Sequence, residues 1–308
     1  MRRPDVTTVA GPPPCVLPSC YISDAIASEP LTLKRLLPSG APATADEIVA
    51  GFELDTLAST GPANRPYVVL NMVSTVDGHA TLGGRSGGLS SRADRELFHG
   101  LRMAVDAVMA GAGTVRVERY GRIIPEESRR RRRVEQGRSE EPLACIVSGR
   151  LALEGDIPLL ADPAAKVAIL TSSAASLPAS AAEVHYIRAE RDGLLDLPAA
   201  LAQLRERFGV HTLLCEGGPH LGAQLLAAGL LDELFLSLAP KLAGGDIDGN
   251  PARPNPAHPE ALRILAGTEL EPPVELELLS ALESASHLFL RYRVKGLRGD
   301  EVAAAGSS

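Results

Sequence analysis

A single carboxylate, Glu216, stands between an apolar run and two glycines in the segment LLCEGGPHLGAQLL, residues 213–226. The apolar run is typical of a buried strand, and the residues from Pro219 onward have helical spacing. Glycine lets the backbone approach a ligand closely, and the first turn of a helix presents N–H groups that suit a phosphate. The segment therefore predicts a ligand-binding turn, although glycine-rich turns of this kind are also common in purely structural units.

Two further strand ends carry polar groups of the same kind. In MAGAGTVRVE, residues 109–118, an apolar run ends in glycine and Thr114 begins a helix, which it can either cap or help to bind a phosphate. In IVSGR, residues 146–150, Ser148 and Arg150 can hold the 2′-phosphate that distinguishes NADPH from NADH, and a solvated turn arginine explains them about equally well. Ligands of α/β sheets bind at the carboxyl ends of strands, so the three turns together indicate a bound dinucleotide.

The glycine-rich segment STVDGHATLGGRSGG, residues 74–88, adds a second carboxylate, Asp77. Long loops of this type are usually functional or disordered, and Asp77 can equally start a turn with the glycine that follows it. Glu216 and Asp77 are the candidate catalytic acids. A buried glutamate with a raised pKa can donate a proton, and either residue can instead anchor a hydroxyl or a ring N–H.

Alternating elements must position these turns. Strand patterns occur at 67–75, 105–111, 143–148, 166–171, 210–216 and 232–240, and helical patterns occur at 43–54, 91–103, 195–209 and 219–230. Their order predicts an α/β fold with a mixed, mostly parallel sheet that is covered by helices on both faces. The segments 274–284 and 287–294 predict a C-terminal antiparallel hairpin. We expect an N-terminal extension at 1–60, partly disordered, a main domain at 61–296 and a disordered tail at 297–308.

The composition excludes several classes of protein. The chain has 308 residues, a net charge of -7 and only 3% aromatic residues, which argues against a partner nucleic acid or an anionic membrane. The run Arg129–Arg133 is flanked by glutamates, so it predicts a solvated loop or a short surface helix. The four cysteines and seven histidines lack metal-ligand spacing, so we expect no metal. The chain shows neither a signal peptide nor a membrane span, and we expect a cytoplasmic protein.

Three segments together resemble a known family. They are NMVSTVDGHAT, SGGLSSRADRELFHGLRMAVDAVMAGAGTV and LLCEGGPHLGAQLLAAGLLDELFLSLAPKLAGG. In this order and spacing they resemble the reductase domain of the riboflavin-biosynthesis pyrimidine deaminase/reductases, over residues 65 to 295 or so. The resemblance implies a dihydrofolate-reductase-like fold, a homodimer, and an NADPH-dependent reduction of the ribose of 5-amino-6-(5-phosphoribosylamino)uracil to ribityl.

The resemblance also implies roles for individual residues. Thr114 and Glu118 match positions that contact the nicotinamide nucleotide, and Ser148 matches the hydroxyl after the next strand. The turn that binds the cofactor pyrophosphate would comprise Gly217, Gly218, Pro219, His220, Leu221, Gly222 and Gln224. On the substrate side, the matching residues are Ser86, Arg102, Arg122 and Glu216.

The chain departs from the family at two points. It has neither the HxE nor the PCxxC motif of a zinc deaminase, so it would be a stand-alone reductase. Asn71 occupies the place of a lysine that usually precedes the S-x-D-G motif and helps to bind the substrate. Two alternative functions stay open: reduction of a pterin- or folate-like substrate, and NADPH binding without catalysis. A classical Rossmann dehydrogenase is disfavoured because no GxGxxG follows the first strand.

Overall fold

The computed structural model describes residues 30–153, 157–178, 180–244, 262–267 and 270–295. The chain divides into the units Met1–Pro30 and Leu31–Ser308, and all described residues except Pro30 belong to the second unit. The expected tail at 297–308 and the cysteines at 15 and 20 lie outside the described residues.

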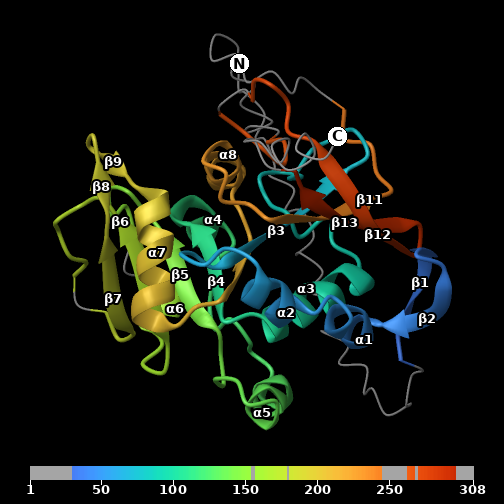
Figure 1. Ribbon diagram of the computed structural model, residues 1–308, viewed down its shortest axis with the longest axis horizontal. Helices are drawn as coiled ribbons and strands as arrows, with labels where there is room; N and C mark the ends of the chain where they lie inside the picture. Colours follow the sequence, from blue (N-terminus) through green and yellow to red (C-terminus); the bar gives the residue numbers. More distant parts are fainter. Residues whose placement is uncertain (1–29, 154–156, 179, 245–261, 268–269, 296–308) are drawn as a thin grey trace, which may run out of the picture. The chain divides into compact units, whose positions relative to one another are not determined.

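Most of the described strands belong to one mixed sheet, with the order β2-β1-β12-β13-β11-β3-β10-β4-β5-β6-β7 (Figure 1). From β11 to β7 every neighbouring pair is parallel. These strands are β3 (Tyr67–Thr75), β4 (Ala107–Gly111), β5 (Leu143–Val147), β6 (Lys166–Thr171), β7 (Glu183–Arg188), β10 (Thr212–Cys215) and β11 (Glu233–Ala239). The expected hairpin is β12 (Leu276–Ser284) with β13 (His287–Val294), and β13 pairs with β11. The predicted mixed, mostly parallel sheet is confirmed. A separate small sheet pairs β8 (Glu190–Arg191) with β9 (Leu194–Leu195).

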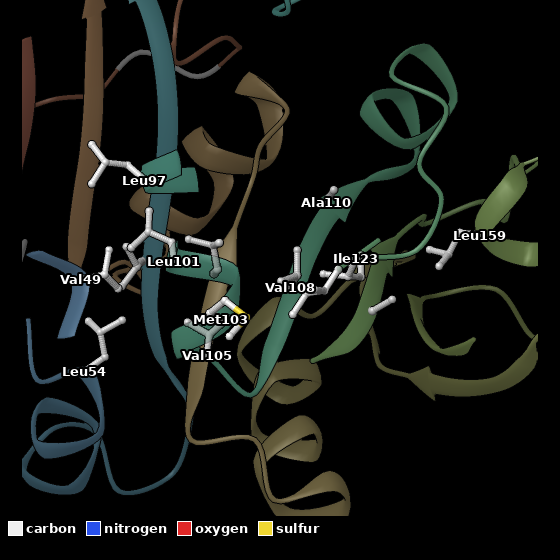
Figure 2. Close-up of a cluster of buried hydrophobic side chains, with 14 of the residues drawn as sticks. Val49, Leu54, Leu97, Leu101, Met103, Val105, Val108, Ala110, Ile123 and Leu159 are labelled. Atoms are coloured by element: carbon white, nitrogen blue, oxygen red, sulfur yellow. The ribbon is translucent and has the colours of Figure 1, made fainter. Parts of the chain in front are cut away.

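Helices cover both faces of the large sheet, as predicted. Because side chains alternate along a strand, neighbouring residues of β3 belong to different cores. Val69 belongs to the core that also contains residues of α1 (Ala45–Ala50), α2 (Leu54–Thr60), α3 (Arg92–Ala104) and α6 (Pro158–Ala161). Val68 belongs to the core that also contains residues of α7 (Leu197–Phe208) and α8 (Pro219–Ala227). Figure 2 shows part of the first core, with Val49, Leu97 and Leu101 drawn together.

Helix α3 forms where the sequence pattern predicts it. The side chain of Ser91 accepts a hydrogen bond from the backbone N–H of Asp94 at 3.1 Å and so caps the first turn. Leu97 and Leu101 lie four residues apart on the buried face. The helix ends at Val105, whose backbone is extended. This helix forms one wall of the site described below.

The segment before residue 61 is part of the same fold. Strand β1 (Thr32–Leu37) pairs with β12, and β2 (Gly40–Thr44) pairs with β1. Thr44 and Glu47 form a capping box at the start of α1. Leu33, Ile48 and Val49 are buried in the core that contains α3. Residues of this segment therefore pack with the main sheet, because the strand that partners β1 lies at the other end of the sequence.

The arginine run forms the short helix α5 (Glu127–Glu135), but one of its members is not solvated. Arg133 has an exposed fraction of 0%. Its Nη1 donates to the backbone carbonyls of Arg102 at 3.2 Å, Met103 at 2.7 Å and Val105 at 3.0 Å. A guanidinium thus caps the end of α3, where the last carbonyls lack helical partners. Burial lowers the pKa of Arg133 to about 10.

Candidate active site

A cleft of about 750 Å³ lies at the carboxyl ends of β4 and β10, against β3 and one face of α3. Each wall comes from a different segment. Asn71 projects from β3, Ser86 from the glycine-rich loop and Arg102 from α3. Thr114 follows β4 on α4 (Ala112–Val117), and Glu216 follows β10. The cleft therefore occupies the sheet edge that the strand-end turns predict.

Glu216 is held by two side chains in the wall of this cleft. Arg102 donates to Glu216 from Nε to Oε1 at 2.6 Å and from Nη2 to Oε2 at 2.7 Å. The hydroxyl of Tyr120 donates to Oε2 at 2.6 Å. The exposed fraction of the Glu216 side chain is 2% and that of Arg102 is 10%. Bidentate geometry of this kind fixes both groups in one orientation. We call these three residues the cleft triad.

Tyr120 is the member of the cleft triad that the sequence analysis missed. Burial, followed by the nearby Glu216 carboxylate, raises the pKa of Tyr120 well above its ordinary value, so its hydroxyl keeps its proton and donates. The carboxylate of Glu216 is an acceptor in all three of its contacts. This arrangement suits a residue that anchors a donor of the ligand better than one that presents an O–H toward the cleft.

Ser86, which is expected to contact the substrate, and Glu118, which is expected to contact the cofactor, are hydrogen-bonded to each other. The backbone N–H and the hydroxyl of Ser86 both donate to Oε1 of Glu118, at 3.0 and 2.9 Å. Ser86 matches a substrate position and Glu118 a cofactor position in the sequence analysis. Their contact ties the glycine-rich loop to the turn that follows α4.

The two glycine turns lie against each other. The N–H of Gly111 donates to the carbonyl of Gly217 at 2.9 Å, and Gly217 has a φ of +86°, which favours glycine. A Cβ atom on Gly218 would lie only 2.8 Å from Oγ1 of Thr114. Gly218 precedes α8, which has no side-chain cap. The absence of side chains and the free first turn of α8 form a cradle that fits a cofactor pyrophosphate.

The structure brings most of the expected site residues together. Those that line the cleft are Asn71, Ser86, Arg102, Thr114, Glu118, Arg122, Glu216, Gly218, Pro219, His220 and Leu221. Ser148 and Arg150 lie at the end of β5, beside β4, and do not line the cleft. Gly217, Gly222 and Gln224 also lie outside its lining. At Gly222 a Cβ atom would meet the side chain of Leu70 at 3.1 Å, so this glycine lets α8 pack on the sheet.

Asp77 is placed away from the cleft lining and has local partners. Its carboxylate accepts hydrogen bonds from the hydroxyl of Thr75 and from the backbone N–H groups of Ala243 at 3.0 Å and Gly244 at 2.7 Å. These hydrogen bonds, that of Thr75 foremost, hold the pKa of Asp77 well below its ordinary value. A carboxylate of this kind is an acceptor that joins two loops, and its low pKa does not suit a proton donor at neutral pH.

Cationic side chains gather at the cleft more than the sequence analysis expected. Besides Arg122, they are Arg95, Arg116 and Arg119. Arg122 donates to Glu141 at 3.1 Å, and Arg116 donates to the carbonyl of Ala152. Arginine side chains in the lining of one cleft suit an anionic ligand such as a phosphate. Among the described residues, no cluster of three histidine, cysteine or acidic side chains forms a metal site, and no helix is long and apolar enough to cross a membrane.

The RibD C-terminal domain model matches residues 66–274, which carry the cleft and most of the sheet. The chain belongs to this family. The match confirms the resemblance that the three sequence segments indicated. It spans β3 to the loop before β12, so β1, β2 and the C-terminal hairpin lie outside it.

Relatives and solved structures agree with this membership. A 2,5-diamino-6-ribosylamino-4(3H)-pyrimidinone 5′-phosphate reductase of Methanothermobacter thermautotrophicus is 28% identical over 75% of this chain and 100% of its own length. A protein of the same name from Archaeoglobus fulgidus is 28% identical over 59% of this chain and 83% of its own. The structure of a pyrimidine reductase-like protein from Corynebacterium diphtheriae has a TM-score of 0.62 at 23% identity, over 82% of this chain and 99% of its own, which confirms the fold. Both relatives are named as reductases, so the predicted oxidoreductase class is confirmed.

Proposed function

We propose that the chain is an NADPH-dependent reductase of a 6-ribosylaminopyrimidine 5′-phosphate, and that it converts the ribosyl group to ribityl. One observation supports this proposal. The cradle at Gly218 and Thr114, which fits a pyrophosphate, and the cleft triad line the same cleft. Two forms of the pyrimidine fit the description. One is 5-amino-6-(5-phosphoribosylamino)uracil, and the other is the 2,5-diamino-pyrimidinone named for the relatives.

The cofactor side of the cleft is built from backbone rather than from side chains. Gly218 and the first turn of α8 would hold the pyrophosphate, and the hydroxyl of Thr114 would bond the nicotinamide nucleotide. When bound, NADPH supplies the hydride that reduces the C=N or C=O carbon of the ribose. Ser148 and Arg150, at the end of the neighbouring strand β5, are the candidates for the 2′-phosphate that separates NADPH from NADH.

The chain's own side chains would orient the substrate. Glu216, held ready by Arg102 and Tyr120, accepts from a hydroxyl or ring N–H of the ribotide. The arginines that line the cleft would bind the 5′-phosphate. Reduction of C=N to CH–NH consumes one hydride and one proton. The structure assigns no side chain to the delivery of that proton, since Glu216 already accepts hydrogen bonds from Arg102 and Tyr120 and Asp77 does not line the cleft.

Assembly and location are also part of the proposal. Resemblance to the family supports a homodimer, and the predicted cytoplasmic location remains part of the proposal. Sedimentation of the purified chain at several concentrations tests the dimer. A monomer at all concentrations would overturn that part of the proposal and leave the chemistry standing.

The experiment that tests the reaction follows NADPH oxidation by its absorbance, with both ribotides and dihydrofolate offered in parallel to the purified chain. Turnover of a ribotide, strongly reduced in Glu216→Gln, is the expected result. Turnover of dihydrofolate alone would replace the substrate by a folate, which the neutral Asn71 in place of a lysine makes the second candidate. NADPH binding without any turnover would favour a binding protein. Replacing NADPH by NADH tests whether the enzyme prefers the cofactor with the 2′-phosphate.

A further inference from the structure

The glycine-rich loop at 81–88 contributes to the cleft lining and has few packing contacts of its own. Gly83 and Gly84 have φ values of +59° and +80°, and a Cβ atom on either would meet nothing within 4 Å. On either side of the loop, Ala80 and Leu89 are buried, with exposed fractions of 5% and 0%. A segment with few buried contacts between two fixed ends opens at low free-energy cost, so individual hydrogen bonds can decide its position.

Among the residues that the structure describes, two side chains from outside this loop hold it by hydrogen bonds. Oε1 of Glu118 accepts from the backbone N–H of Ser86 at 3.0 Å and from its hydroxyl at 2.9 Å. Lys241 donates to the carbonyl of Gly88. Ser86 and Glu118 line the cleft, whereas Lys241 does not. The contact with Glu118 is therefore the one that a ligand in the cleft can affect directly.

Glu118 is also connected to the cofactor cradle, through the short helix α4. The backbone N–H of Glu118 donates to the carbonyl of Thr114 at 2.9 Å. Thr114 in turn lies so close to Gly218 that a Cβ atom there would be 2.8 Å from its Oγ1. A ligand that fixes Thr114 at the cradle therefore also restrains the backbone of Glu118, one helical turn away. Contiguous contacts of this kind can carry energetic coupling between two sites.

Glu118 can contact a cofactor and Ser86 at the same time. Both hydrogen bonds from Ser86 go to Oε1. The second oxygen of the carboxylate, Oε2, can accept from a hydroxyl of the cofactor while Ser86 stays bound. A cofactor that orders Glu118 in this way removes part of the entropy cost of ordering the loop. A second ligand that contacts the loop then binds more tightly, so the two ligands favour each other.

We propose that Glu118 is a positioning residue that couples the two sides of the cleft. A cofactor in the cradle fixes Glu118, Glu118 fixes Ser86 and its loop, and the loop then holds the substrate. This inference rests on the proposed reductase function of the same cleft, and it adds positive cooperativity between the two ligands. By linkage, the substrate tightens the binding of the cofactor by the same factor.

Hydrogen–deuterium exchange of residues 81–88 tests the link from the cofactor to the loop. NADP⁺ occupies the cofactor site without turnover, and at saturation it is expected to slow the exchange of this loop in the wild type. Glu118→Ala should lose that response. Lys241→Met is the matched control, because it removes the other hydrogen bond to the loop and leaves the connection to α4 intact. Its loop should exchange faster, and NADP⁺ should still slow it.

Calorimetry measures the coupling itself, as the Kd of each ribotide with and without saturating NADP⁺. In the wild type, NADP⁺ is expected to lower the Kd of the bound ribotide by ~5-fold or more, and Glu118→Ala should abolish this change. Ser86→Ala removes the hydrogen bond of the hydroxyl and should lose part of the effect, whereas Ser86→Thr keeps a hydroxyl and should retain it. If Glu118 only stabilised the fold, its loss would leave the ratio of the two Kd values unchanged.

The outcomes separate this inference from the reductase proposal. Loop exchange that NADP⁺ leaves unchanged, an equal response in Glu118→Ala and the wild type, or a ribotide Kd that NADP⁺ raises would overturn the inference while the reductase proposal stands. Failure of NADP⁺ to bind would overturn both. If NADP⁺ binds and neither ribotide does, the proposed substrate is wrong, and the exchange experiment still decides the role of Glu118.

The Ser86 variants decide the question if Glu118→Ala does not fold. A response to NADP⁺ that is smaller in Ser86→Ala than in Ser86→Thr would then support the inference. An equal response in Ser86→Ala and the wild type would overturn it.

Discussion

Glu216 and Glu233 each bind one arginine and one tyrosine, at two different places in the fold. Each carboxylate accepts two hydrogen bonds from one arginine and one from a tyrosine: Glu216 from Arg102 and Tyr120, and Glu233 from Arg291 at 2.8 and 2.8 Å and Tyr67 at 3.0 Å. Only the first set lines the cleft. The second set is therefore an internal control for the stability effects of the first.

The substitution Tyr120→Phe should show whether Tyr120 positions Glu216 for activity or only stabilises the fold. Loss of the hydrogen bond to the Glu216 carboxylate is expected to cost about 1.5–3 kcal/mol of unfolding free energy. We also expect kcat/KM to fall by ~10-fold, because about 1.4 kcal/mol corresponds to a factor of ten. Urea denaturation and steady-state kinetics measure the two effects. Tyr67→Phe should lower the stability similarly and leave kcat/KM of the folded protein unchanged. Equal kinetic effects of both changes would show that Tyr120 acts only through stability.

Gly218→Ala should weaken cofactor binding. The new Cβ would lie 2.8 Å from Oγ1 of Thr114, so that one wall of the cradle must move. Overpacking of this kind costs about 1–3 kcal/mol, which corresponds to a rise of ~10-fold or more in the Kd for NADPH. Fluorescence titration with NADPH measures the Kd. Gly51→Ala, at the end of α1 and outside the cleft lining, provides the control, and a Kd unchanged in Gly218→Ala would place the cofactor elsewhere.

Arg133→Met should destabilise the fold although it lies in a run of surface-type residues. The change leaves three carbonyls at the end of α3 without their donor. We expect a loss of about 3 kcal/mol or more in urea denaturation. Arg131→Met changes a neighbour whose side chain is 72% exposed, and it should cost less than about 0.5 kcal/mol. Similar losses for both variants would contradict the capping role.

Asp77 should make the fold sensitive to acid. The pKa of Asp77 is depressed in the folded state, so its contribution to stability is complete above the ordinary value of 3.8 and is lost as the pH falls below it. We therefore expect Asp77→Asn to be less stable than the wild type near neutral pH, with a difference that shrinks below about pH 4. Urea denaturation over this range measures the difference. A gap that widens toward acid pH would contradict the assignment.

Many of the residues that line the cleft could be predicted from the sequence, because they lie in turns that directly follow recognisable strands. The strand-end turns at Thr114 and Gly218 follow β4 and β10, which are neighbours in the sheet, so strand topology alone brings these two turns together. Ser148 follows the next strand, β5, and lies outside the cleft lining. The cap at Ser91 is equally local. Tyr120 was missed because only the path of the chain after α4 turns it toward Glu216.

A run of identical residues also limits what a sequence pattern can predict about the burial of each one. In the run Arg129–Arg133 nothing distinguishes the member that enters the protein, and Arg133 does so because α5 packs beside the end of α3. For β1, the segment LTLKRLLP is too short to be assigned alone. It becomes a strand because Lys34 pairs with Glu283, a partner far along the chain that no local pattern identifies.

The sheet has a strand at its margin, β2, with Pro42 inside it. Proline supplies no backbone N–H, so this margin cannot present a continuous row of donors to another chain. Aggregation by edge-to-edge strand pairing is thereby discouraged at β2. If two copies of the chain associate, we do not expect them to join their sheets across this margin.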